Sequence, residues 1–219
     1  MTTEAIHIYG PSFSNFVRTV MLICEEKNTP YSVGFEVAGE AVEFKGEQHL
    51  KWHPFGKIPV LIENPSQQDK LVLPETASIC RYLDTDKALQ PSNSVAYAHH
   101  DALCAVISID IDKVLVREYL LEFAFPKGES NSVRFDVVNK AQAKVAATLA
   151  IIENMLNKDN CLSAEQFTIA DALLVPMLHY LSCLPSEYSL IADYPNIKQY
   201  LEKLMARPSC QKVLIAKKL

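Results

Sequence analysis

The chain has no long hydrophobic run and no recognisable targeting segment. No stretch approaches the roughly 18 consecutive apolar residues that indicate a membrane-spanning helix. The first residues, Met1-Thr2-Thr3-Glu4, lack the charged, apolar and cleavage regions of a secretory signal peptide. We therefore expect a cytoplasmic protein that has no membrane partner.

Clustered cysteines and clustered basic residues are also missing. The six cysteines include no C-x-x-C pair, a distribution typical of reduced residues in a reducing compartment. The 21 lysines and arginines are scattered and the net charge is −5, which argues against nucleic acid as a partner. His100 and Cys104 could share one helix face, but no second pair of metal ligands accompanies them, so we expect no metal site.

The first half of the chain contains alternating strand and helix patterns. Short apolar runs bounded by turn residues indicate strands, and apolar residues at three- and four-residue steps indicate helices. The order is βαβ and then ββα, which predicts an α+β domain with a small mixed sheet. The segment 38–52 fits neither pattern well and is expected to form an irregular helix. The expected strands are 6–9, 31–37, 60–62 and 70–73, and the expected helices are 15–27 and 75–83.

Beyond a linker at 85–93, every pattern in the sequence is helical. We expect a first domain at 1–84, this linker, and an all-helical domain at 94–219. Thr168 and Asp171 fit a capping box in which each side chain accepts from the backbone N–H of the other, so Asp171 is assigned a structural role. The expected helices of this half are 94–123, 131–157, 169–184, 195–206 and 209–216.

The strongest functional pattern combines a proline at a strand start with an acidic residue at a helix start. Pro59 opens an apolar strand, which indicates a turn that leaves the N–H and C=O of Ile58 free to pair with another peptide backbone. Glu75 and Thr76 then supply a carboxylate and a hydroxyl where helix N–H groups attract anions. The sequence therefore predicts a small, peptide-like, zwitterionic ligand.

Four segments, in order, resemble those of the glutathione S-transferase family. The run at 8–20 is similar to the first strand and helix of serine-type members, particularly the phi class. The others are His-Pro-Phe-Gly-Lys-Ile-Pro-Val-Leu at 53–61, Glu-Thr-Ala-Ser-Ile at 75–79 and Phe-Thr-Ile-Ala-Asp-Ala at 167–172. The resemblance implies a thioredoxin-like N-terminal domain, an all-helical C-terminal domain, glutathione as co-substrate, a hydrophobic electrophile and a homodimer.

The resemblance implies that Ser14 is the catalytic residue. Its hydroxyl would donate a hydrogen bond to the glutathione sulfur and, together with the dipole of the helix that follows, lower the pKa of the thiol. Ser12 is an alternative for this role and otherwise a glutathione-binding residue. From spacing alone, Ser14 is read first as a helix N-cap. Tyr9 is interpreted as a packing residue at a strand end.

The resemblance also assigns the remaining glutathione contacts. Thr76 stands where the family usually has Ser, and Phe44 stands where phi-type members have His. On spacing alone, Glu75 is a helix-capping carboxylate and the two lysines named below are ordinary solvated residues. The implied ligands are Lys45 and Lys57 for the glycyl carboxylate, Ile58 and Pro59 for the peptide backbone, and Glu75 and Thr76 for the γ-glutamyl end.

The electrophile is expected between the two domains, against an apolar wall of the kind that small-molecule sites usually have. A second function stays open at this point: a non-catalytic transferase-like module that binds a protein partner or carries a ligand. The intact glutathione motifs argue against this module, because a pure scaffold has no need of a glutathione cradle. The wall is expected to include Phe13, Ile111, Leu115 and Tyr119.

Overall fold

The structure, a computed structural model, describes residues 6–156, 162 and 164–215. The chain divides into two compact units, Met1–Leu89 and Gln90–Leu219. The predicted linker, 85–93, contains the point of division. Across the described residues, no helix combines the length and the apolar character that crossing a membrane requires.

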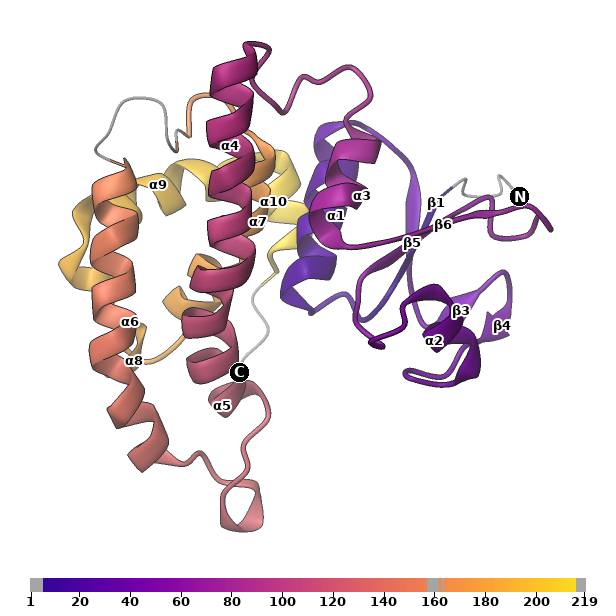
Figure 1. Cartoon of the computed structure of the whole chain (residues 1–219). Helices are drawn as coiled ribbons and strands as arrows, with labels where there is room; N and C mark the ends of the chain where they lie inside the picture. Colours follow the sequence, from indigo (N-terminus) through magenta and orange to yellow (C-terminus); the bar gives the residue numbers. More distant parts are fainter. Residues whose placement is uncertain (1–5, 157–161, 163, 216–219) are drawn as a thin grey trace. The chain divides into compact units, whose positions relative to one another are not determined.

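The first unit has the mixed α/β order that the sequence predicts, with one addition, a two-stranded hairpin (Figure 1). Its elements are β1 (Ile6–Tyr9), α1 (Asn15–Glu26), β2 (Tyr31–Gly34), β3 (Glu36–Val37), β4 (Glu40–Ala41), α2 (Glu47–Trp52), β5 (Val60–Glu63), β6 (Leu71–Pro74) and α3 (Thr76–Leu83).

Four strands form the main sheet in the order β2-β1-β5-β6. β1 runs parallel to β2 and antiparallel to β5, and β5 runs antiparallel to β6. In this register Tyr9 lies opposite Val60, and Val60 lies opposite Pro74. The end of β1, the start of β5 and the end of β6 therefore meet at one edge of the sheet.

Apolar side chains cover both faces of this sheet. Tyr9, Val60 and Ile62 form a buried cluster with Trp52 of α2. Because neighbouring residues of a strand point to opposite faces, the fully buried Ile8 and Leu61 lie on the other face. In Figure 1, α1 and α3 lie together on that side of the sheet and α2 lies on the other.

The structure corrects the predicted strand 31–37 and the predicted irregular helix 38–52. The strand is broken after Gly34, and a hairpin of β3 and β4 follows it. The hairpin loop is Ala38-Gly39, and both residues have positive φ, 53° and 85°. Two-residue loops of this geometry match the twist of the flanking strands, which explains the hairpin. Only the last part of the segment, α2, is helical.

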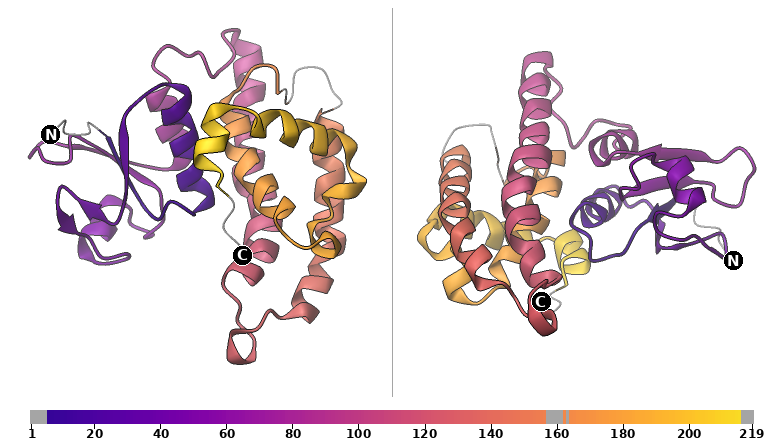
Figure 2. Two further views of the ribbon diagram at one scale, coloured as in Figure 1. Left: turned by 180° about the vertical axis from the view of Figure 1, so that it is seen from behind. Right: turned by 60° about the horizontal axis from the view of Figure 1, so that its bottom comes forward.

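The second unit is helical throughout its regular elements (Figure 2). From Ser94 to Ala124 the backbone stays helical, but it widens to π-type turns over Ile107–Ile111 and Lys113–Leu120. The remaining α-helices are α6 (Phe135–Leu156), α7 (Ile169–Ser182), α8 (Ser186–Ser189), α9 (Pro195–Met205) and α10 (Pro208–Val213), with α4 (Ser94–Val106) and α5 (Leu121–Ala124) at the ends of the widened stretch.

Helix α7 forms the centre of the second unit. Eleven consecutive residues from Ile169 to His179 are buried, and the helix packs against α4, the π-type stretch and α9. The predicted capping box is present at its start, where the Thr168 hydroxyl accepts from the Asp171 N–H at 3.5 Å and the Asp171 carboxylate accepts from the Thr168 N–H at 2.8 Å. The structural role assigned to Asp171 is therefore confirmed.

Candidate functional site

The sheet register brings most of the predicted glutathione ligands to one edge. Ser12 and Ser14 follow β1, Ile58 and Pro59 precede β5, and Glu75 follows β6. Because Tyr9, Val60 and Pro74 lie side by side, the three connecting segments start from neighbouring positions.

The loop from β1 to α1 lies directly against the segment before β5. Gly10 has φ 140°, and a Cβ built on it would lie 3.2 Å from Cβ of Ile58 and 2.7 Å from Cγ2 of Val17. Only a residue without a side chain fits this close approach. The buried Arg18 holds the same loop, because its Nε donates to the Ser12 carbonyl at 3.3 Å. Arg18 was not selected from the sequence.

Ser14 occupies the N-cap position of α1, but its hydroxyl makes no capping hydrogen bond to the first turn. A hydroxyl in this position normally accepts from a first-turn N–H, so the capping interpretation drawn from spacing alone has no support. Tyr9 is not an alternative to Ser14 for activating the thiol, because it is fully buried and its hydroxyl donates to the Val42 carbonyl at 3.1 Å. Its interpretation as a packing residue is confirmed.

Ile58 and Pro59 are joined by a cis peptide bond. The strand pairings of β5 begin at Val60, so the N–H and C=O of Ile58 lie outside the ladder. Ile58 is half-buried. A peptide backbone arriving at this edge would meet these two groups at the start of β5.

Glu75 combines an unusual backbone with an exposed carboxylate. Its φ is 71°, and its side chain is 66% exposed. A non-glycine residue held in this region is strained, and such residues cluster at ligand sites. The buried His53 lies beneath it: Nδ1 accepts from the Phe55 N–H at 3.3 Å and Nε2 lies 3.4 Å from the Glu75 carboxylate. His53 therefore presents an N–H to Glu75, and Thr76 begins α3 directly afterwards.

Lys45 and Lys57 are exposed cationic residues on segments beside this edge. The Lys45 ammonium lies 5.5 Å from the centre of the Phe44 ring, and the Lys57 ammonium lies 6.0 Å from the centre of the Phe55 ring. A Cβ on Gly56 would lie 3.0 Å from Cγ of Lys45, so the two lysine-bearing segments are in contact.

The four residues expected at the electrophile wall divide between the two units. Phe13, in the first unit, is 42% exposed. Ile111, Leu115 and Tyr119 are buried, and the Tyr119 hydroxyl donates to the Tyr188 carbonyl at 2.8 Å. Their role toward an electrophile stays a prediction.

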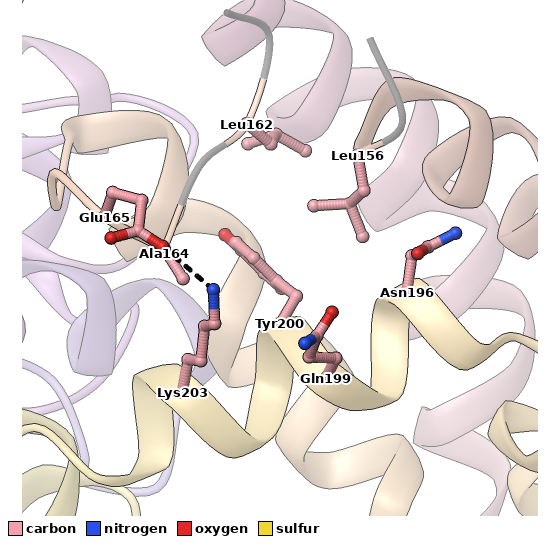
Figure 3. A pocket seen from close by; sticks show the side chains of 8 residues that line it. All are labelled: Leu156, Leu162, Ala164, Glu165, Asn196, Gln199, Tyr200 and Lys203. Carbon is pink, nitrogen blue, oxygen red and sulfur yellow. Dashed lines mark hydrogen bonds and ion pairs between the residues drawn. The ribbon is translucent and has the colours of Figure 1, made fainter. Parts of the chain in front are cut away.

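A cavity of about 160 Å³ in the second unit contains none of the predicted ligands. Figure 3 shows it between the end of α6 and one side of α9, with an ion pair between Glu165 and Lys203 across it at 2.9 Å. Among the described residues, no three His, Cys, Asp or Glu side chains gather as a metal site would require. The cavity is lined by Leu156, Leu162, Ala164, Glu165, Asn196, Gln199, Tyr200 and Lys203.

Two family models match the chain, one in each unit. The model of the glutathione S-transferase N-terminal domain matches residues 13–86, and the model of the glutathione S-transferase C-terminal domain matches residues 118–208. The fold and both matches define the class: a thioredoxin-like domain followed by an all-helical domain, as the sequence predicted. The chain belongs to the glutathione S-transferase family.

Individual relatives agree with this assignment. Glutathione S-transferase F6 of Arabidopsis thaliana is 26% identical over 95% of this chain and 99% of its own length, and the probable glutathione S-transferase GSTF1 of Oryza sativa subsp. japonica is 29% identical over 95% and 94%. These relatives are of the phi class, as the resemblance predicted.

Solved structures of the family match nearly the full length of the chain. Glutathione S-transferase-I bound with lactoylglutathione matches with a TM-score of 0.77 and 25% identity, over 96% of this chain and all of that one (100%). Glutathione S-transferase III in its apo form matches with a TM-score of 0.74 and 28% identity, over 98% and 97%.

Proposed function

We propose that the protein is a glutathione transferase that activates the glutathione thiol for attack on a hydrophobic electrophile. The observation that supports the proposal is that the segments carrying Ser14, Ile58 and Glu75 start from neighbouring positions at one edge of the sheet, while the segments carrying Lys45 and Lys57 contact each other at Gly56. The membership of both halves of the chain in the transferase family supports the same activity.

The charges of this edge match those of glutathione. At neutral pH the tripeptide carries an ammonium and a carboxylate at its γ-glutamyl end and a carboxylate at its glycyl end. Glu75 would bind the ammonium, and Thr76 at the N-terminus of α3 would bind the neighbouring carboxylate. The backbone of Ile58 would pair with the cysteinyl residue in strand-like fashion, before Pro59. Ser12 would contact the same ligand from the loop after β1.

The glycyl carboxylate would bind between two ammonium groups, those of Lys45 and Lys57. Both side chains are exposed and extend from segments that contact each other at Gly56. Opposite charges attract, although exposed ion pairs are individually weak. Two lysines would attract the glycyl carboxylate more strongly than one lysine alone.

Ser14 would make the sulfur nucleophilic. A free thiol has a pKa of about 8.5 and is mostly protonated at neutral pH. A hydrogen bond donated by the Ser14 hydroxyl and the positive end of the α1 dipole both favour the thiolate. The thiol proton leaves to solvent, the sulfur forms a bond to the electrophilic carbon, and the leaving group departs with the electron pair of the broken bond.

The test compares Ser14→Ala with Ser66→Ala in the conjugation of glutathione to an aromatic halide. Ser66 is an exposed serine in the turn between β5 and β6, at the other end of the sheet. We expect Ser14→Ala to lower kcat/KM about a hundredfold, the usual cost of one donor to a developing anion, and Ser66→Ala to match the wild type. If Ser14→Ala keeps full turnover while Ser12→Ala loses it, Ser12 is the activating residue.

The alternative, a non-catalytic module, makes a different prediction. Such a module needs no thiolate, and the strained backbone of Glu75 would serve no purpose in it. A wild-type protein that binds a macromolecular partner stoichiometrically and is not retained on immobilised glutathione would favour the module.

We also propose a cytoplasmic homodimer. The six cysteines include no C-x-x-C pair, which supports a reducing compartment. The homodimer is the form that the family membership suggests, and we place Phe55, a large aromatic side chain that is 80% exposed, at its interface.

A further inference from the structure

A buried histidine connects the two lysine-bearing segments. His49 of α2 is completely buried. Its Nδ1 accepts a hydrogen bond from the Lys45 backbone N–H at 3.0 Å, and its Nε2 lies 2.9 Å from the Lys57 carbonyl oxygen. A carbonyl oxygen can only accept, so Nε2 carries the proton and Nδ1 is the acceptor. Both ring nitrogens are thereby satisfied in the neutral form.

The ring is held in place by packing as well as by these bonds. Its centre lies 4.7 Å from that of Tyr9 and 5.4 Å from that of Phe44. Tyr9 belongs to the central strand β1 and is itself fully buried. His49 therefore attaches both lysine segments to a rigid part of the sheet.

The Lys45 backbone needs such support. Lys45 has φ 64°, a left-handed conformation that costs free energy for a residue with a side chain. The hydrogen bond from its N–H to His49 stabilises this conformation. The direction in which the Lys45 side chain leaves the backbone follows from this conformation, and the Lys57 backbone is fixed by the same ring.

We propose that His49 is a positioning residue for the glycyl-carboxylate end of glutathione. It touches no substrate, because it is completely buried; it sets the spacing of the Lys45 and Lys57 ammonium groups through their backbones. This inference rests on the proposed function, since it assigns a role within the same site. Loss of His49 would leave both lysines in the chain but no longer aimed at one carboxylate.

Three substitutions separate the contributions of the ring and its two hydrogen bonds. His49→Phe keeps an aromatic ring in the cluster and removes both bonds. His49→Asn puts an amide oxygen near the Nδ1 position, where it can accept from Lys45, and His49→Gln puts an amide N–H near the Nε2 position, where it can donate to Lys57. His7→Phe is the matched control, because His7 is also a buried histidine with both ring nitrogens hydrogen-bonded. It is 3% exposed, lies on β1 and bonds to Ser32 and Gly34 of the neighbouring strand β2.

We expect His49→Phe to raise the KM for glutathione about tenfold, the effect of losing about one hydrogen bond between a lysine and the glycyl carboxylate. The kcat at saturating glutathione and the KM for the electrophile should stay within about twofold, because the thiol end is untouched. His49→Asn and His49→Gln should each recover part of the loss. His7→Phe should keep the wild-type KM for glutathione.

A double-mutant cycle with Lys45→Ala distinguishes positioning from a general loss of packing. If His49 acts through the lysine, His49→Phe has a smaller effect on the KM in the Lys45→Ala background than in the wild type. Equal effects in both backgrounds would overturn the proposal, as would a wild-type KM in folded His49→Phe. If His49→Phe does not fold, the cycle is run with His49→Gln and the same outcomes decide.

The failure of this inference is distinguishable from failure of the proposed function. A wild-type protein that does not bind glutathione overturns both. A wild-type protein that binds and conjugates glutathione, with a KM insensitive to His49, overturns the positioning role alone.

Discussion

Replacement of Asp171 by alanine should destabilise the second unit by several kcal/mol. The Asp171 carboxylate is completely buried and accepts from the Thr168 N–H at 2.8 Å, from the Thr168 hydroxyl at 2.6 Å and from the Tyr200 hydroxyl at 2.5 Å. Tyr200 lies on α9, where Figure 3 shows it beside Lys203. One side chain therefore caps α7 and connects it to α9.

The magnitude follows from the partners that lose their acceptor. Alanine leaves the buried Tyr200 hydroxyl unsatisfied, at about 1–3 kcal/mol, and removes the Thr168 N–H bond that forms half of a capping box, at about 1 kcal/mol. We expect a loss of about 2–4 kcal/mol out of the roughly 5–15 kcal/mol that stabilise a typical domain. Asp171→Asn keeps one carbonyl oxygen as an acceptor and should cost about half as much.

The two variants also differ from the wild type in their pH dependence. Burial raises the pKa of Asp171 from its ordinary 3.8 to about 6, against the opposing hydrogen bonds from Thr168 and Tyr200. The pKa of Asp171 is higher in the folded protein than in the unfolded chain. The stability that this difference contributes is therefore complete below about pH 4 and is lost as the pH rises through about 6. The free energy of unfolding of the wild type, relative to Asp171→Asn, should therefore fall by up to about 3 kcal/mol over this interval.

The assay is urea denaturation followed by circular dichroism at several pH values between 4 and 7. A loss under about 1 kcal/mol in Asp171→Ala would show that the Tyr200 hydroxyl and the Thr168 N–H do not need Asp171 as an acceptor. A difference between wild type and Asp171→Asn that does not change with pH would show that burial does not raise the pKa of Asp171.

Three further outcomes are expected. Hydrogen bonds from Arg134 lower the pKa of Glu122 from 4.5 to about 2. The free energy of unfolding of the wild type, measured by denaturation, should therefore fall more steeply than that of Glu122→Gln as the pH falls from 4.5 toward 2. The same pH dependence in both proteins would contradict this. In the folded protein a thiol reagent should label the exposed Cys183 before the buried Cys24, whose pKa burial raises to about 12; peptide mapping that found equal rates would contradict the burial. If the protein forms the proposed dimer, Phe55→Ser should lower the mass measured by light scattering from that of a dimer to that of a monomer, and a variant that stays dimeric would exclude Phe55 from the interface.

Much of the first unit could be predicted because its local patterns agree with its packing. β1, β5 and β6 are short apolar runs beside turn residues, and α1 buries one face at helical spacing. The break after Gly34 could not be predicted. Gly34 itself has φ 152° at the break, and the hairpin that follows needs Ala38 to take a positive φ, a conformation that alanine seldom adopts and that the pairing of β3 with β4 explains.

In the second unit, the sequence predicts that the elements are helices, but it does not predict the type of helical turn. The apolar spacing from Ser94 onward indicates a helix, but it does not distinguish the π-type turns over Ile107–Ile111 from ordinary α-helical ones. Helix α7 was the clearer case, because its capping box is a local signal that fixes where the helix begins.

The candidate site illustrates the same limit. Ser14, Lys57, Ile58 and Glu75 belong to motifs that can be read along the chain. His49 does not, because its importance depends on which backbone groups lie on either side of the ring. From the sequence, a histidine among aromatic residues would be interpreted as a core residue. Only the folded structure shows that His49 connects two segments of the site.

The central claim is that this protein binds glutathione and lowers the pKa of its thiol through Ser14. The most direct test titrates glutathione into the purified wild type by calorimetry and follows the ultraviolet absorbance of the thiolate in the same samples, with Ser14→Ala beside it. We expect binding with thiolate near neutral pH in the wild type, and binding with the thiol still protonated in Ser14→Ala. Wild-type protein that binds no glutathione, or binds it without forming thiolate, would contradict the proposed function.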